Sequence, residues 1–343
     1  MIIFSDLHLR EDSEGMIFRE VLPGLEKAVE DDRSPPPYAR KLVCLGDLWD
    51  VRYRLPVLAL NRLVDWVLKL TTGGNPTHLL LLPGNHDQVN PAGDHALHVL
   101  SKLPGVQVYS QPAQDAFGLW MPYRKDVQEV QRQLARFTAD EAVARGVPLV
   151  LWIHHGIRGA LRNDQATDTD GLDPASMASR FTRVFAGHYH KPQEVLPTVH
   201  YVGSPYEVHA DERGQQKRIC RWDGHSPEWL PVQWGPRTHK LDLGLVGDIQ
   251  ALAETIRLGD RVQVVVQAGD EQTAKAEALR VELARRGVVP VLTPAQARLA
   301  VPSRLQVQPQ AGLGEYARAY VQAFHGELPE DRLLATLDAL RQG

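Results

Sequence analysis

Short apolar runs, each closed by a polar loop, recur along the first two hundred residues. Each run holds apolar residues without alternation, which is typical of a strand covered on both faces. The predicted strands are "MIIF" (1–4), "KLVCL" (41–45), "HLLLL" (78–82), "PLVLWI" (148–153), "RVFA" (183–186) and "VHYV" (199–202). Helical spacing lies between them, at 19–30, 57–70, 94–103 and 126–145. Strands alternating with helices predict an α/β core with helices outside.

The helix predicted over 57–70, "VLALNRLVDWVLKL", has more apolar positions than one face requires. One face can pack on a sheet, and the excess predicts a second buried face. A second copy of the chain would cover this face in a homodimer. Another part of the same chain would cover it equally well, and the pattern leaves both interpretations open.

A second unit is predicted to begin near residue 237. In it "DRVQVVVQA" (260–268) alternates like a strand, "DEQTAKAEALRVELARRG" (270–287) is a charged helix, and "VVPVL" (288–292) follows as a strand. The chain then continues through a stretch with Pro and Gln into two amphipathic helices. The predicted division is 1–236, 237–300 and 301–343.

Composition and charge limit the classes of function. The chain has 343 residues and a net charge of -4, so a basic surface for nucleic acid would have to be a local patch or come from bound cations. Its two cysteines, Cys44 and Cys220, exclude a disulfide framework and favour a reduced, cytoplasmic compartment. The start of the chain has no signal-peptide pattern and no apolar run is long enough to span a membrane, so we expect no membrane association.

Five polar clusters follow predicted strands. They are "SDLH" with Asp6 and His8, "GDLWD" with Asp47 and Asp50, "GNHD" with Asn85, His86 and Asp87, "IHHG" with His154 and His155, and "GHYH" with His188 and His190. Carboxylate, imidazole and amide groups are metal ligands, and no thiolate is among them. Because ligands bind beyond the carboxyl ends of strands in open α/β sheets, the clusters predict a metal centre.

The number of candidate ligands favours two metal ions. The seven candidates are Asp6, His8, Asp47, Asn85, His154, His188 and His190. One zinc site uses about three or four ligands, and one carboxylate can bridge two ions about 3.5–4 Å apart. Asp47 is the best candidate for that bridge. Two divalent cations would leave the pocket positive and suited to a phosphodiester, and the mixed ligands favour manganese, iron or zinc over magnesium. Our first choice is Mn²⁺.

The chain resembles the calcineurin-like metallophosphoesterases in all five motifs and in their order, over residues 6–190. The resemblance implies an αββα sandwich. It also implies one metal held by Asp6, His8, Asp47 and His190, and another held by Asp47, Asn85, His154 and His188. In such a centre an activated water attacks phosphorus, and no Ser or Cys nucleophile is needed.

The resemblance further implies that His86 contacts the phosphate and protonates the leaving oxygen. We expect the neighbouring Asp87 to hold the His86 ring by a hydrogen bond. Asp50 is expected to support the site or to cap a helix rather than bind a metal. His155, next to the predicted ligand His154, receives no role.

Longer stretches narrow the resemblance to the SbcD-type nucleases of double-strand-break repair and phage recombination. They are "LGDLWDVRYRLP", "PGNHD", "MPYRK" (121–125) and "HYVGSPYEVHADERGQQKR" (200–218). The resemblance implies a DNA exonuclease, single-strand endonuclease or both, a capping, DNA-binding domain over 237–300, and terminal helices that bind the coiled coil of an SbcC-type ATPase. Loop cations are expected to contact DNA phosphates. These are Arg52, Arg54, Arg124, Lys125 and Arg158.

The sequence leaves two other functions open. A stand-alone phosphatase or phosphodiesterase would act on a small phosphate ester, and it would not need the terminal helices. A non-catalytic scaffold on the same fold would be free to lose ligands, whereas all seven candidates are present. Metal content and activity on DNA and on a chromogenic diester separate the three.

Overall fold

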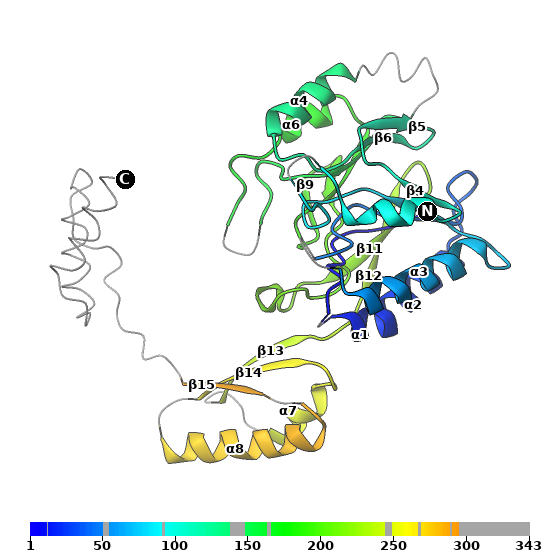
Figure 1. Ribbon diagram of the computed structural model, residues 1–343. Helices are drawn as coiled ribbons and strands as arrows, with labels where there is room; N and C mark the ends of the chain where they lie inside the picture. Colours follow the sequence, from blue (N-terminus) through cyan, green and yellow to red (C-terminus); the bar gives the residue numbers. More distant parts are fainter. Residues whose placement is uncertain are drawn as a thin grey trace, which may run out of the picture.

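The computed structural model describes residues 1–11, 13–50, 55–90, 93–137, 148–162, 166–243, 249–266, 269–288 and 290–294. Arg52, Arg54 and the predicted ATPase-binding segment 301–343 lie outside these residues. The chain folds as a mixed α/β structure with two six-stranded sheets and a third sheet of three strands (Figure 1). Within the described ranges, no helix is long and apolar enough to cross a membrane.

The first sheet has the strand order β12-β11-β1-β2-β3-β4. Its strands are β1 (Ile2–Phe4), β2 (Lys41–Cys44), β3 (His78–Leu81), β4 (Val106–Val108), β11 (Lys217–Trp222) and β12 (Pro227–Val232). Strands β1 to β4 are parallel, and β11 is antiparallel to both β1 and β12. The N-terminal strand β1 therefore lies between β2, the next strand in the sequence, and β11, which comes about two hundred residues later.

The second sheet has the order β5-β6-β7-β8-β10-β9. Its strands are β5 (Ala113–Asp115), β6 (Gly118–Met121), β7 (Val150–His154), β8 (Arg183–Gly187), β9 (Gln193–Leu196) and β10 (Val199–Tyr201). The four inner strands are parallel, and the edge strands β5 and β9 are antiparallel to their neighbours. All six strands predicted from the apolar runs are confirmed in one sheet or the other, with bounds that differ by at most two residues.

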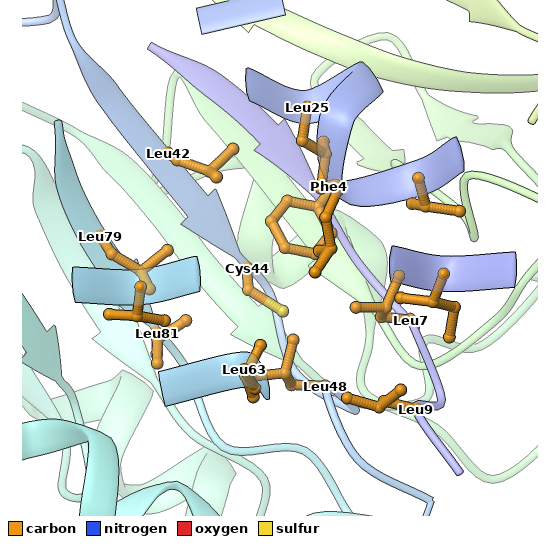
Figure 2. Packing of buried hydrophobic residues seen from close by; sticks show 14 of the residues in the cluster. Phe4, Leu7, Leu9, Leu25, Leu42, Cys44, Leu48, Leu63, Leu79 and Leu81 are labelled. Atoms are coloured by element: carbon orange, nitrogen blue, oxygen red, sulfur yellow. The ribbon is translucent and has the colours of Figure 1, made fainter. Parts of the chain in front are cut away.

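Alternate residues of the central strands enter different apolar clusters. In β1, Phe4 belongs to a cluster shared with the helices, while Ile3 belongs to a cluster with residues from both sheets. In β7, Trp152 lies in that inner cluster and Ile153 faces the helices on the other side. Figure 2 shows the first outer cluster, where Phe4 lies among leucines of the strands and helices. The two sheets are thus stacked face to face, with helices on both outer sides.

Local sequence signals start two of the helices on the large sheets. Those on the first sheet are α1 (Glu14–Met16), the π-helical turn η1 (Ile17–Val21), α2 (Leu22–Glu30), α3 (Val57–Thr72) and the 3₁₀ helix η2 (Ala96–Lys102), and those on the second are α4 (Val127–Arg136) and α6 (Pro174–Ala178). The carboxylate of Asp126 accepts the backbone N–H of Gln128 and caps α4. Asp173 caps α6 in the same way, with Pro174 as its first residue.

Two predicted helices differ in detail. The helix expected over 94–103 is the shorter 3₁₀ helix η2. At its start, the N–H of Ala96 donates to the carbonyl of Asp87, and at its end the N–H of Leu103 donates to the carbonyl of Leu100. Only two tight 3₁₀ turns fit between these two hydrogen bonds. The helix expected over 126–145 runs to Arg136, and residues 138–147 lie outside the described part.

Helix α3 is covered largely by its own chain. Ala59, Leu63 and Val67 are buried, and Val64 and Trp66 pack at the border of the same cluster. The apolar residues that stay most exposed begin the helix, Val57 at 67% and Leu58 at 74%. The second buried face is therefore mostly intramolecular, and the homodimer stays a prediction.

The third sheet has parallel strands in the order β13-β14-β15 and its own apolar cluster. Its elements are β13 (Thr238–Asp242), α7 (Ile249–Thr255), β14 (Arg261–Val266), α8 (Asp270–Arg285) and β15 (Val291–Pro294). The strand and helix predicted over 260–287 are confirmed, whereas the last strand begins three residues later than expected. The carboxylate of Glu207 accepts the N–H of Thr238 at 2.7 Å and joins this unit to the rest. A capping, DNA-binding role for it stays a prediction.

Candidate metal centre

The five polar clusters meet where the strands of the two large sheets end. Asp6 and His8 follow β1, Asp47 follows β2 and Asn85 follows β3, all in the first sheet, while His154 ends β7 and His188 and His190 follow β8 in the second. The backbone N–H of His188 donates to the carboxylate of Asp6 at 3.1 Å, across the two sheets. The seven predicted ligands thus lie together, although 184 positions separate the first from the last.

Asp6, His8 and His190 form one group that could hold a metal ion, with ligand atoms within 4.8 Å of one another. The Nε2 atoms of His8 and His190 face each other at 2.9 Å. His8 is 1% exposed, so its ring is withdrawn from water. Two imidazole nitrogens directed at one point beside a buried carboxylate are a donor set that a cation would satisfy.

Asp47, His154 and His188 form a second such group. Oδ1 of Asn85 lies between the two rings, 3.2 Å from Nε2 of His154 and 2.7 Å from Nδ1 of His188. Oδ2 of Asp47 lies 3.2 Å from Nε2 of His154 and 3.8 Å from Nε2 of His8. Asp47 is therefore placed between the two groups, as the sequence predicted for the shared ligand.

Backbone strain is concentrated at these residues. Asp6, His8, Asp47 and His188 have positive φ angles of 55°, 48°, 52° and 102°. Arg40 is the one other non-glycine residue with this conformation in the described ranges. Such a conformation costs on the order of 1–3 kcal/mol per residue and gathers at functional sites. The fold therefore holds four candidate ligands in place at a cost in stability.

The glycines of the motifs allow the strand ends to approach one another. A Cβ atom on Gly84 would lie 2.1 Å from Oδ1 of Asp47. A Cβ atom on Gly46, whose φ is 99°, would lie 2.1 Å from Nδ1 of His154. Glycine is therefore needed in "GNHD" and "GDLWD" because a side chain would displace a candidate ligand.

The electrostatics of the site favour bound cations. Burial opposes ionisation of Asp47, yet the positive charge and hydrogen bond of His154 hold the pKa of Asp47 well below its usual range. Burial would lower the pKa of His154, but the charge of Asp47 raises it to about 9. Burial and the charge of His154 lower the pKa of His188 to about 3, so this ring is neutral at physiological pH. Neutral imidazole and ionised carboxylate are the forms that bind metals, so Asp47 and His188 have their binding forms, whereas a cation would have to displace a proton from His154.

His86 is supported by a different carboxylate from the one predicted. Its Nδ1 lies 2.6 Å from Oδ1 of Asp50, whose other oxygen accepts from Arg10 at 3.1 Å. Asp87 points back into the turn, where its oxygens accept the backbone N–H groups of Trp49 and Gly84, both at 2.9 Å. The expectation that Asp87 holds the ring is thus corrected: Asp87 closes the turn, and Asp50 contacts the imidazole. Asp50 supports the site, as expected for that residue.

The predicted cations and His155 are largely engaged within the chain. Arg124 donates to the carbonyl of Ser110 and to Gln111, both at 2.7 Å, and Arg158 pairs with Asp173. Lys125 is exposed. The ring of His155 is buried, with Nε2 3.0 Å from the carbonyl of Arg124, so it serves the structure of the loop. DNA contact by these cations stays a prediction.

Three residues near the centre were not predicted from the sequence. Glu212 contacts His190, Lys217 contacts Glu212, and the His209 ring stacks on that of His190 with centroids 5.4 Å apart. They come from the polar stretch "EVHADERGQQK", which does not directly follow a predicted strand. The spacing of His209 and Glu212, which form a capping box at the 3₁₀ helix η3 (Ala210–Glu212), was the available signal.

Comparison with known proteins adds no family assignment. Neither the models of known protein families nor the characterised proteins searched give a match for this chain. The chemistry must therefore be inferred from the site itself, a buried set of imidazole and oxygen donors that could hold a metal ion.

Proposed function

We propose that the chain is a two-metal phosphodiesterase that cleaves DNA, a nuclease of the SbcD type among the calcineurin-like metallophosphoesterases. One observation carries the proposal: two groups of candidate ligands lie at one point, and Asp47 lies between them. A scaffold would have no need of four strained backbone conformations at the same point. The donor set fits two divalent cations, of which Mn²⁺ is the first choice and Fe²⁺ and Zn²⁺ are alternatives.

The residues divide between the two ions by proximity. Asp6, His8 and His190 would hold one ion, His154, His188 and Asn85 would hold the other, and Asp47 would contact both. Divalent cations at such a centre activate water at neutral pH and stabilise the charge that develops on phosphoryl oxygens. The protein supplies a fixed geometry and excludes bulk water, since Asp6, Asp47 and His154 are at most 1% exposed.

His86 is the proposed proton donor. Its side chain is 27% exposed, so a substrate can reach it. Its Nδ1 is held by Asp50, so the proton to be transferred is the one on Nε2. The ionised carboxylate of Asp50 stabilises the protonated ring. The nearby ring of His8, with Nδ1 3.7 Å from Oδ2, and the hydrogen bond from His86 in turn hold the pKa of Asp50 well below its usual range. His86 and Asp50 would therefore deliver a proton to the leaving oxygen.

An arginine-lined cavity favours a polyanionic substrate over a small ester. The cavity has a volume of about 640 Å³ and lies between the first helical turns and the third-sheet unit, lined by Arg10, Arg19, Arg257 and Arg261. Among the described residues that line it, Glu20 is the one acidic residue, and its carboxylate accepts the N–H of Gly235. Because Arg10 also contacts Asp50, the cavity adjoins the proposed proton donor. Phosphates flanking the cleaved one would find cations there despite the acidic chain.

A cleavage assay on several substrates tests the proposal. Metal-free protein would be loaded with Mn²⁺ and given supercoiled plasmid, linear duplex, single-stranded DNA and a chromogenic diester. We expect two ions per chain and cleavage of DNA that chelation abolishes. Turnover of the diester alone would favour the small-ester enzyme, and bound metal without any turnover would favour the scaffold.

The partner is a separate proposal. We propose that residues beyond 308 bind the coiled coil of an SbcC-type ATPase in the cytoplasm. A chain ending at Gln308 should keep metal-dependent cleavage of single-stranded DNA and lose co-purification with the ATPase. Unchanged binding of the ATPase by this shorter chain would contradict the assignment.

A further inference from the structure

A buried ion pair lies directly behind one of the candidate ligands and outside all five motifs. Oε2 of Glu212 and Nζ of Lys217 are 2.6 Å apart, and the two side chains are 6% and 5% exposed. A buried ion pair is often no more stabilising than apolar residues of the same volume, because both charges lose their hydration. Its presence here therefore calls for a reason other than stability.

The carboxylate of Glu212 is held from several sides. Its Oε1 lies 2.7 Å from Nδ1 of His190 and accepts the backbone N–H of His209 at 3.2 Å. Its Oε2 accepts the N–H of Val208 at 3.0 Å, besides the contact with Lys217. A carboxylate with this many donors has one orientation, so the oxygen facing His190 is fixed before any ligand binds.

Lys217 ties the same arrangement to the first sheet. It is the first residue of β11, the strand that pairs with β1. Its Nζ donates to Oγ of Ser204 at 2.9 Å and to the backbone carbonyl of His190 at 3.1 Å. Both the ring and the main chain of His190 are therefore connected to the ion pair.

We propose that Glu212, held by Lys217, is a positioning residue that fixes the orientation and tautomer of His190. An ionised carboxylate only accepts hydrogen bonds, so the proton of the neutral ring must be on Nδ1. Nε2 then carries its lone pair and faces Nε2 of His8 at 2.9 Å, where the first ion of the proposed centre would lie. The functional part of this inference rests on the proposed metal centre, whereas the tautomer does not.

The test removes both charges together, because a single substitution would leave a buried lone charge. In Glu212→Leu/Lys217→Met, the ring of His190 loses its acceptor while the volume is kept. Loss of such supporting carboxylates typically lowers metal affinity about 10–100-fold. We expect a loss of that size for one Mn²⁺ ion by calorimetry. Glu212→Gln/Lys217→Met, which keeps a side-chain oxygen at position 212 and also removes both charges, should lose less Mn²⁺ affinity. In metal-free wild type, nitrogen NMR of labelled histidines should show His190 protonated on Nδ1, and Glu212→Leu/Lys217→Met should lose this preference.

Glu207→Gln is the matched control. Glu207 is a buried carboxylate of the same segment whose oxygens accept the N–H groups of Gly214 and Thr238. This variant should lose stability with unchanged Mn²⁺ affinity and an unchanged His190 tautomer.

Three results would overturn the positioning role. The first is wild-type Mn²⁺ affinity in Glu212→Leu/Lys217→Met, and the second is an unchanged His190 tautomer in that variant. The third is a loss of metal from that variant as complete as that from His190→Ala, which would make Glu212 a ligand. If the wild-type chain binds no Mn²⁺, the proposed function fails, and the NMR comparison alone decides the role of Glu212.

Discussion

Two buried carboxylates, one in the candidate metal centre and one in the third-sheet unit, have similar hydrogen bonds and opposite pKa shifts. Asp87 accepts the backbone N–H groups of Trp49 and Gly84, and Asp260 accepts those of Arg237 and Arg257. Burial and the charge of Asp47 raise the pKa of Asp87. Burial works in the same direction at Asp260, but the backbone hydrogen bonds and His239 outweigh it and lower the pKa.

The difference comes from the neighbours. Asp260 has an imidazole beside it, with Nε2 of His239 at 2.8 Å from Oδ2. Asp87 shares its surroundings with a second buried carboxylate. In the described part of 238–294 there is no non-glycine residue with positive φ and no candidate metal group. Asp87 is buried beside a like charge and Asp260 beside an imidazole, and this difference accounts for the opposite directions of their pKa shifts.

The largest expected effect comes from removing the shared carboxylate. Asp47→Ala should lose both metal ions and all DNA cleavage, because this side chain lies between the two groups of candidate ligands and would contact both ions. Elemental analysis of the dialysed protein would measure the metal content. Asp260→Asn, in the other region, should keep two ions per chain. If Asp47→Ala also retains two ions, Asp47 is not the shared ligand.

Removing the proposed proton donor should have a smaller effect. His86→Ala should keep both metals and lose about 10²–10⁴-fold in the rate of DNA cleavage, the usual contribution of general acid catalysis. A diester with a good leaving group should recover most of the rate, because its oxygen leaves without a proton. His239→Ala removes an Asp-paired imidazole outside the candidate metal centre and should cleave DNA at the wild-type rate. A wild-type rate in His86→Ala would remove His86 from the mechanism.

A third test asks whether the two regions share the substrate. Arg19 lines the cavity from the first helical turns, and Arg257 and Arg261 line it from the third-sheet unit. In a plot of the logarithm of the DNA association constant against the logarithm of the salt concentration, the slope is negative. Each Arg→Ala variant should reduce the magnitude of this slope by about 1, if each arginine neutralises one phosphate. Arg136→Ala, on α4 and outside the cavity, should leave the slope unchanged. An effect of Arg19 alone would limit binding to the first domain.

The smallest expected effect is the pH dependence of the third-sheet unit. Because the folded pKa of Asp260 is below its usual value of about 3.9, its stabilisation is present above that pH and is lost as pH falls through the folded pKa. Asp260→Asn should reduce hydrogen-exchange protection of β13 and β14 by on the order of 1.5–3 kcal/mol near pH 6. The difference from wild type should shrink on acidification, after correction for intrinsic exchange. A constant difference would show that the carboxylate charge is not the cause.

The strands and the candidate ligands could be predicted because both follow from short local patterns. A run such as "KLVCL" specifies a strand covered on both faces, and the polar residues that follow must lie at its end. The partition of the strands between two sheets does not follow from the runs, because β2 and β7 are equally apolar and both contribute to the layer between the sheets. The edge strand β9 was missed for the opposite reason, because it is only partly buried and carries no apolar run. The inner strands β6 and β11 were not predicted either, although they are largely buried.

Side-chain partners were harder to predict than positions. Asp87 follows His86 directly in the sequence, whereas Asp50 belongs to another motif 36 positions earlier. Which of them faces the ring depends on how the turn after β3 packs on the turn after β2, and there Asp87 is used by two backbone N–H groups. Glu212 meets His190 from 22 residues away, in a loop with no periodic pattern, so no local rule could join them.

The antiparallel pairing of β1 with β11 and the contact of His188 with Asp6 have a consequence for biosynthesis. The backbone of His188 and the carboxylate of Asp6 are 182 positions apart, and Ile3 pairs with Cys220. A chain leaving the ribosome therefore exposes Asp6, His8 and Asp47 long before their partners exist. Contacts of such sequence separation form late and slow the folding of a domain. Metal uptake would accordingly be a post-translational step, completed only after the strand at 217–222 has closed the first sheet.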